Sequence, residues 1–411
     1  MNVARAQTRI DREGDLPTTA RNATLGDLAQ ILQDQQARKV DIVAPASAIR
    51  SEGGTWIVEG AEPVLSDEGV TASEGIYRPT KVADEGIAGR LSIPVGYLRR
   101  MREERTDLYD ANINGWLHGG DWQRGVLDQH GVGPMTENLP DAGPDPRSFL
   151  VRAFRVDGST GIARAMLSDR YRIVDHLDVL TAALDGVRQA GAEVEIEACD
   201  LTDRRMMVRI ASPEVRELAP DVLRGYRSPF SGQTGEDNPV ISAGFVISNS
   251  ETGSGAFTLT PRLRVEVCKN GMTMTKDALR SVHLGGKMDD GVIRWSEETQ
   301  SKNLELVTAQ ARDAVSTFLD VEYVRTKINE MRAAAEIEVE EPAKAVQRIT
   351  TSLRIGSDAA DPILAHFIKG GDTSAAGMMQ AVTSYAQTVE DADTAADIEA
   401  AAFDAMALAA R

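Results

Sequence analysis

Apolar and polar residues alternate through much of the middle of the chain, a pattern that predicts strands. Leu263 and Val265 point to one side of the backbone, while Arg262, Arg264 and Glu266 point to the other. This alternation is typical of a half-buried strand with a cationic outer face. Similar patterns predict strands at 148–155, 162–167, 194–198 and 206–210, the last two forming an antiparallel hairpin.

Apolar residues spaced by three and four positions predict helices on either side of these strands. Thr24 is placed to cap a first helix, and another runs from 175 or 176 to 189. The longest apolar stripe, at about 296–336, predicts one long helix, with shorter helices at 343–353 and 373–389. The chain is therefore expected to combine a sheet with many helices.

Residues 82–104 have the outline of a helix-turn-helix. Helical patterns at 82–91 and 95–104 flank a Ser-Ile-Pro turn, and several arginines lie on or after the second helix. Such a pair either reads DNA or is a structural helical hairpin, and the sequence leaves both interpretations open.

Together these elements predict an α+β protein with a central antiparallel or mixed sheet and packed helices. Helical additions are expected at both ends, including one long helix. The polar residues 1–23 are expected to fray, and four prolines and three glycines at 131–147 predict a linker. The expected units are a small α+β unit at 1–77, a helical segment at 78–130, the linker at 131–147, a central sheet domain at 148–295, and a helical region with an acidic tail at 296–411.

Charge is distributed unevenly along the chain. Lys and Arg number 45 against 63 Asp and Glu, which gives a formal net charge of −18. An acidic chain is repelled by nucleic acids and anionic membranes unless its cations are localised. Residues 151–300 carry 19 basic and 22 acidic side chains, whereas residues 301–411 carry 10 and 18. Any contact with phosphate is therefore expected in the middle of the chain.

Side chains that usually bind metals or carry catalysis are scarce. The only cysteines are Cys199 and Cys268, and no two of the five histidines have the spacing of metal ligands on one helical face. The sequence has no P-loop and no nucleophile elbow. Asp169 and Asp175 offer a carboxylate pair, although a charged strand end leading into a helix is the simpler interpretation. We expect no catalytic residue, metal or cofactor; a binding role is favoured over an enzyme, which the sequence leaves open.

The stretch NSETGSGAFTLTPRLRVEVCKNGM (249–272) resembles the phage and plasmid-like family called domain of unknown function 932. The stretch LSDRYRIVDHLDVL (167–180) and, more loosely, SIPVGYLRRM and NINGWL within 92–117 are similar to that family as well. The resemblance covers about residues 80–390. It implies no settled activity, but the order of strands and helices is similar to that of the single-strand annealing proteins of phage recombination.

Location and assembly are predicted from the same features. No apolar run approaches the roughly 20 residues of a membrane span, and the N-terminus has no apolar signal core. Two isolated cysteines suit a reducing compartment, so we expect a cytoplasmic protein, and the resemblance to a phage family implies a bacterial host cell. Long helices and exposed strand edges favour a homo-oligomer.

Two functions follow as hypotheses. The first is a phage- or plasmid-type recombination protein that binds and anneals single-stranded DNA on a cationic face of the central sheet, without nucleotide hydrolysis. The alternative is an acidic phage accessory protein that binds a host or phage protein, as a DNA mimic or inhibitor, and binds no nucleic acid. The candidate nucleic-acid-binding residues are Arg152, Arg155, Arg164, Arg170, Arg172, Arg262, Arg264, Lys269, Lys276 and Arg280.

Overall fold

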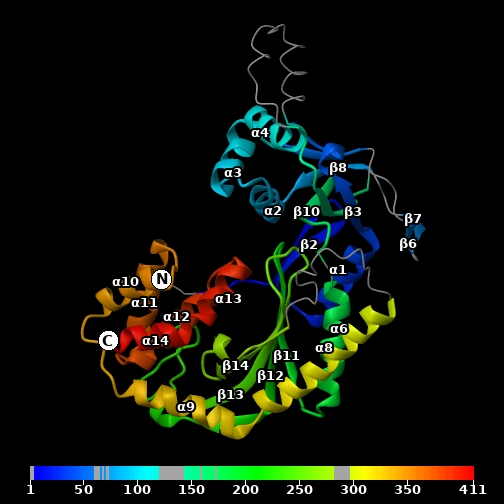
Figure 1. Cartoon of the computed structure of the whole chain (residues 1–411). Coiled ribbons are helices and arrows are strands. Elements are labelled where there is room, and N and C mark those ends of the chain that lie inside the picture. The colour runs from blue at the N-terminus through cyan, green and yellow to red at the C-terminus, as the bar shows by residue number, and fades with distance from the viewer. Residues whose placement is uncertain are drawn as a thin grey trace.

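The computed structural model describes residues 4–59, 65–66, 69–70, 74–119, 143–157, 160–171, 174–281 and 297–411. Within these residues a large curled antiparallel sheet and a smaller mixed sheet are packed with helices, which confirms the predicted α+β fold (Figure 1). Most of the predicted linker at 131–147 lies outside the described residues.

The larger sheet has eight strands and combines the start of the chain with its middle. Its strands are β1 (Arg9–Glu13), β2 (Leu16–Ala23), β11 (Glu195–Leu201), β12 (Met206–Leu218), β13 (Val240–Asn249), β14 (Phe257–Val265), β15 (Asn270–Thr273) and β16 (Leu279–Ser281). The β1–β2 hairpin pairs with β11, so most of the segment expected to fray is part of the sheet. From β11 to β14 the strands form an antiparallel meander, and β15 and β16 both pair with β14.

The smaller sheet has the strand order β3-β9-β10-β8-β5-β4. Its strands are β3 (Lys39–Pro45), β4 (Ile49–Glu52), β5 (Thr55–Val58), β8 (Gly75–Pro79), β9 (Ser148–Phe154) and β10 (Gly161–Ser168), and β6 (Leu65–Ser66) pairs with β7 (Gly69–Val70) separately. The hairpin at 148–168 was expected in the central sheet, but it pairs with β3 and β8. Phe149, Val151 and Ala153 of β9 complete the apolar core of this N-terminal part. The boundary predicted at 131–147 therefore does not separate the two sheets.

Three helices cover one face of the smaller sheet: α2 (Lys81–Leu91), α3 (Val95–Glu104) and α4 (Thr106–His118). The helical pair predicted at 82–104 is present as α2 and α3. Its apolar side packs against the sheet. In the same core, the indole N–H of Trp56 in β5 donates to the Tyr109 hydroxyl of α4 at 3.0 Å. The pair is thus built into the core of this part of the molecule.

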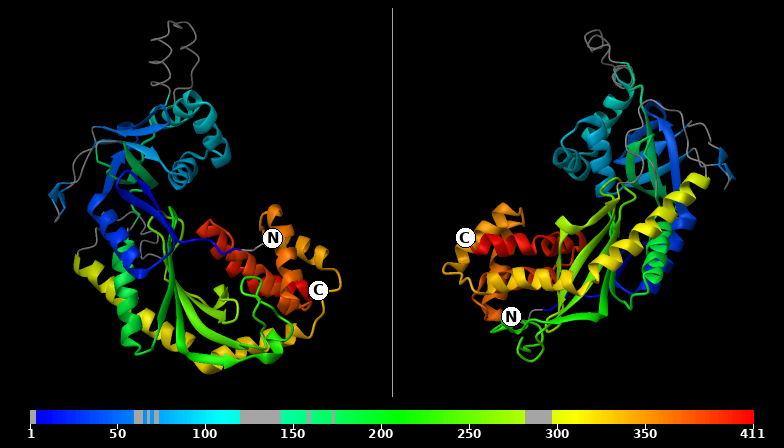
Figure 2. Two further views of the ribbon diagram at one scale, coloured as in Figure 1. Left: turned by 180° about the vertical axis from the view of Figure 1, so that it is seen from behind. Right: turned by 60° about the horizontal axis from the view of Figure 1, so that its bottom comes forward.

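Helices also cover the convex face of the larger sheet (Figure 2). They are α1 (Leu25–Arg38), α6 (His176–Gln189), α8 (Glu297–Phe318) and α9 (Val321–Ala335). Thr24 and Asp27 form the capping box that starts α1, as the sequence predicted for Thr24. The prediction of a single helix at 296–336 is wrong, because α8 ends at Phe318 and a second helix, α9, begins at Val321. Asp320 caps α9 by accepting from the backbone amides of Glu322 and Tyr323.

The C-terminal helices gather at the β15 side of the larger sheet and reach its concave side (Figure 1). They are α10 (Pro342–Ser352), α11 (Ala360–Gly370), α12 (Ala375–Ala386), α13 (Ala392–Ala400) and α14 (Ala402–Ala409), and the short α7 (Pro220–Leu223) precedes β13. Among the described residues, 3₁₀ turns lie at Ala46–Ala48, Thr275–Asp277 and Ser357–Ala359. Within the described ranges, no helix is both long and apolar enough to span a membrane.

The turn between β11 and β12 ties the three parts together. Arg204 pairs with Glu85 of α2, while the next residue, Arg205, pairs with Asp393 and Asp397 of α13, at 2.7 Å each. One turn of the curled sheet therefore holds the N-terminal helices on one side and the C-terminal helices on the other.

Candidate functional site

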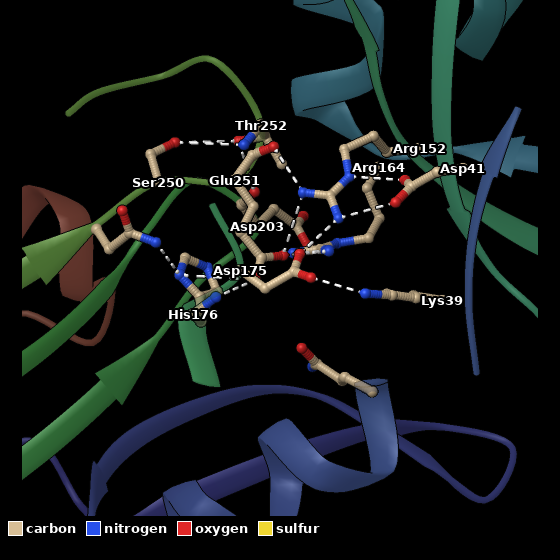
Figure 3. Close-up of polar contacts among 12 residues, drawn as sticks. Lys39, Asp41, Arg152, Arg164, Asp175, His176, Asp203, Ser250, Glu251 and Thr252 are labelled. Atoms are coloured by element: carbon tan, nitrogen blue, oxygen red, sulfur yellow. Dashed lines mark hydrogen bonds and ion pairs between the residues drawn. The ribbon is translucent and has the colours of Figure 1, made fainter. Parts of the chain in front are cut away.

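The first concentration of polar side chains lies where the two sheets meet. We call it the junction cluster, and its members are Lys39, Asp41, Arg152, Arg164, Asp175, His176 and Glu251 (Figure 3). Arg152 alternates with the apolar residues of β9 and so points away from α2–α4. In β10 the register shifts between Ala163 and Ala165, and the extra residue is Arg164. A bulge re-aims a side chain, and here it directs Arg164 to Glu251 in the β13–β14 connection.

Arg152 is the centre of the cluster and only 1% exposed. Its Nε lies 2.7 Å from Asp41 Oδ1, its Nη2 lies 2.8 Å from Asp175 Oδ1, and its Nη1 donates to the Glu251 carbonyl oxygen at 3.1 Å. Burial alone would lower the pKa of Arg152, but the carboxylates of Asp41, Glu251 and Asp175 raise it above its usual value. The side chain is therefore a permanent cation that joins the two sheets.

Glu251, in the β13–β14 connection, receives contacts from the smaller sheet and from the start of α6. Its Oε2 lies 2.6 Å from Arg164 Nη1, and its Oε1 accepts the backbone N–H of His176 at 2.5 Å. Burial would raise the pKa of Glu251, but the backbone N–H of His176 and the guanidinium groups of Arg164 and Arg152 hold it far below its usual range. Lys39 Nζ, 2.7 Å from Asp175 Oδ2, completes a set of three cations and three carboxylates. The charges of the cluster balance within the protein.

His176 is buried at the start of α6 and is neutral. Its Nδ1 lies 3.0 Å from the Asn249 amide nitrogen, which donates to it, and that amide is also 3.2 Å from the Val174 carbonyl oxygen. Burial, aided by Arg164 and Arg152, lowers the pKa of His176 from 6.5 to about 4. The start of α6 and the β13–β14 connection, which lie far apart in the sequence, therefore meet at this cluster.

Because the pKa of His176 is lowered in the folded chain, we expect the free energy of unfolding to depend on pH. Between pH 6.5 and about 4 the unfolded chain binds a proton at His176 that the folded chain excludes, so stability is full above 6.5 and falls as the pH falls. The loss from this group is about 3 kcal/mol at most. Urea unfolding at pH 7 and pH 5 should show a smaller loss for His176→Gln than for the unchanged chain. An equal loss in both proteins would contradict the assignment.

A small pocket opens beside the cluster, with a free space of about 240 Å³ that includes its part open to solvent. It is lined by Leu32, Gln35, Lys39, Phe154 and Asp175 among others. The charged groups at its wall already pair with one another. Within the described ranges no group of histidines, cysteines and carboxylates has the arrangement of a metal site. The cluster is best explained as the structural joint between the sheets.

The second concentration lies on the concave face of the larger sheet. We call Arg21 of β2, Arg209 of β12, and Arg262 and Arg264 of β14 the arginine row. Asp200 of β11 accepts from both Arg21, at 2.9 Å, and Arg209. In β11 the register shifts between Ile196 and Ala198, and the extra residue, Glu197, pairs with Arg262 and Arg264.

Helix α13 covers this row. Glu399 Oε2 lies 3.5 Å from Arg209 Nε, and its Oε1 lies 4.0 Å from Arg262 Nη2. Burial lowers the pKa of Arg262, against the opposing effect of Glu399. The Nε atoms of Arg21 and Arg262 are buried and have no hydrogen-bond partner among the described residues. The carboxylates thus leave part of the donor capacity of the row unused.

Beyond α13 the concave face continues as a half-buried hydroxyl patch, which we define as Ser248, Thr258 and Thr260. Ser248 lies opposite Thr258 in the β13–β14 pair, and Thr258 lies opposite Arg280 of β16. Residues directly opposite each other in antiparallel strands share a face, so the patch and the exposed Arg280 lie on one surface.

The structure divides the ten predicted nucleic-acid-binding residues among different surroundings. Arg152 and Arg164 are in the junction cluster, and Arg262 and Arg264 are in the arginine row. The cationic outer face expected on β14 is therefore covered, because α13 and Glu197 pack against it. The exposed members are Arg155, Arg170 and Arg280, together with Lys269, which is 3.1 Å from Glu266, and Lys276, which is 2.9 Å from Asp404; Arg172 lies outside the described residues.

Three comparisons, with models of protein families, with curated proteins and with solved structures, found no match to this chain.

Proposed function

We propose that this chain binds single-stranded DNA on the concave face of its larger sheet, as a recombination or annealing protein without nucleotide hydrolysis. The observation that carries the proposal is the division of that sheet into two unlike faces. The convex face is apolar and packed under helices, whereas the concave face carries the arginine row and, next to it, the hydroxyl patch.

The chemistry of the concave face suits a phosphate backbone. Guanidinium groups bind phosphate oxygens with two parallel hydrogen bonds, and serine and threonine hydroxyls are common phosphate partners. Aromatic residues make up 5% of the chain, and the patch and the row contain none. Contacts would therefore fall on the backbone more than on stacked bases, which gives binding without sequence preference.

The order of elements gives further support. The meander β12–β13–β14 is followed by α8, which packs on its convex face through Val307, Ala311 and Val315. The similarity to single-strand annealing proteins rests on a strand–helix–strands–helix order, of which the meander and α8 are the last two parts, and this support is an analogy of fold.

Charge reversal at Arg280 tests the proposed surface. Arg280 is exposed at the end of the hydroxyl patch, so Arg280→Glu should change binding without disturbing a buried pair. We expect affinity for a labelled single-stranded oligonucleotide to fall about tenfold at low salt, with a salt dependence shallower by about one phosphate contact. Fluorescence anisotropy at several salt concentrations measures both. Reversing Arg262 or Arg264 instead would test folding, because Arg262 is buried and Arg264 is mostly buried, and both pair with Glu197.

The matched control is Arg348→Glu, an equal change of charge at an exposed position of α10. It should lower affinity by about twofold or less, through net charge alone. Equal losses in the two variants would remove Arg280 and the hydroxyl patch from the proposed surface.

One observation favours the alternative, an acidic protein that binds a protein partner. Each member of the arginine row has a carboxylate partner in the described part of the chain, and the net charge is −18. Absence of binding to single-stranded DNA at low salt would favour this second function.

A further inference from the structure

We propose that helix α13 is an intramolecular competitor of DNA, whose carboxylates occupy the arginine side of the concave face in place of phosphates. The inference rests on the proposed function, since it assigns the regulation of that same surface. It predicts that binding of a strand displaces α13 from its arginine partners.

The contacts of α13 with the sheet are largely ionic. Asp393 Oδ1 and Asp397 Oδ1 each lie 2.7 Å from the guanidinium of Arg205, and Glu399 lies within 4.0 Å of Arg209 and Arg262. At a rise of 1.5 Å per residue, these three carboxylates span about 9 Å of helix. Carboxylates at the edge of α13 therefore contact Arg205, and the buried Glu399 contacts Arg209 and Arg262, in the way that phosphate oxygens of a DNA strand would.

Apolar attachment of α13 is small. Its buried apolar residues are Ala392, Ala395 and Ile398, so only one side chain larger than a methyl group anchors it. Two alanines and one isoleucine bury little apolar surface compared with α12, whose buried residues include Met378, Met379 and Val382. The apolar attachment of α13 is therefore weaker than that of α12.

The ion pair between Arg205 and Asp397 of α13 is exchangeable. The side chain of Arg205 is 30% exposed and that of Asp397 is 72% exposed, which keeps water and salt close to the pair. Phosphate oxygens would replace the carboxylates as acceptors of the same guanidinium groups. They would also offer acceptors to the Nε groups of Arg21 and Arg262, which the carboxylates leave without a partner among the described residues.

The test removes the two outer charges in the full chain. The double variant Asp393→Asn/Asp397→Asn keeps the shape of both side chains and leaves the buried Glu399 in place. We expect it to bind a labelled single-stranded oligonucleotide about three- to tenfold more tightly than the unchanged chain at the same salt. The control Glu340→Gln/Asp361→Asn changes the net charge equally, at exposed positions with no ion pair in the described ranges, and should change affinity by about twofold or less.

The outcomes separate the two proposals. No binding by any of the proteins would overturn both the proposed function and this inference. Binding by the unchanged chain with no gain in Asp393→Asn/Asp397→Asn, or with an equal gain in the control, would overturn the inference alone. Binding by the double variant and not by the unchanged chain would support it.

A second measurement does not depend on any substitution. Hydrogen exchange of the α13 amides should speed up when the unchanged chain is saturated with the oligonucleotide, while exchange in α12 stays the same. Unchanged protection of α13 in the saturated complex would overturn the inference.

Discussion

Replacing Glu251 with glutamine is expected to lower the free energy of unfolding by about 3–5 kcal/mol. The substitution keeps the shape of the side chain but removes the charge that balances Arg164 and Arg152 in a buried site. It also weakens the acceptor for the His176 backbone amide at the start of α6. Urea unfolding at pH 7, followed by circular dichroism, measures the change.

The control for this variant is Glu236→Gln, which changes an exposed glutamate in the connection that precedes β13. Its effect should stay within about 0.5 kcal/mol. A loss below about 1 kcal/mol for Glu251→Gln would show that the junction cluster does not hold the two sheets together.

The second large effect is expected at Asp200, which is fully buried beneath the arginine row. Its carboxylate accepts from Arg21 at 2.9 Å, from Arg209, and from the Asn22 amide at 2.7 Å. Burial would raise the pKa of Asp200, but Arg209 and Arg21 lower it, so the group is ionised. Asp200→Asn leaves two buried guanidinium groups short of one negative charge, and we expect a loss of about 3–5 kcal/mol.

Thermal and urea unfolding of Asp200→Asn should be compared with those of Glu193→Gln, an exposed acidic position just before β11. The control should change stability by about 0.5 kcal/mol or less. Similar stabilities for the two variants would mean that the concave face tolerates unpaired arginines, and would remove the physical reason for the carboxylates that surround them.

Local patterns predicted elements well where periodicity was strong. The strands at 194–198 and 206–210 and the helix at 176–189 are present as β11, β12 and α6. The break between α8 and α9 was missed because the apolar stripe continues across it. Asp320, an N-cap residue type, was the signal in the sequence.

These local patterns could not predict which distant strands pair with each other. Nothing local in β9 shows that it pairs with β3, more than a hundred residues earlier, because strand partners are chosen by the whole core. The alternation on β14 correctly placed Arg262 and Arg264 on one face. It could not show that α13, at the far end of the chain, covers that face with Glu399.

The candidate site shows the same limit. Arg152 and Arg164 stood out as cations, yet their partners Asp41, Asp175 and Glu251 come from three separate segments. The charged residues Asp175 and Glu251 lie in the two stretches that the sequence analysis singled out, and both contribute to the junction cluster. Motif residues that lie far apart in the sequence and carry opposite charges are candidates for a buried pair.

The central claim is that this chain binds single-stranded DNA through the concave face of its larger sheet. Fluorescence anisotropy of a labelled single strand, titrated with the unchanged chain at about 50 mM and about 200 mM salt beside a duplex of the same sequence, tests it most directly. The account predicts binding of the single strand that weakens steeply with salt, and weaker binding of the duplex. Absence of binding at about 50 mM salt and micromolar protein would contradict it, because phosphate contacts are strongest there.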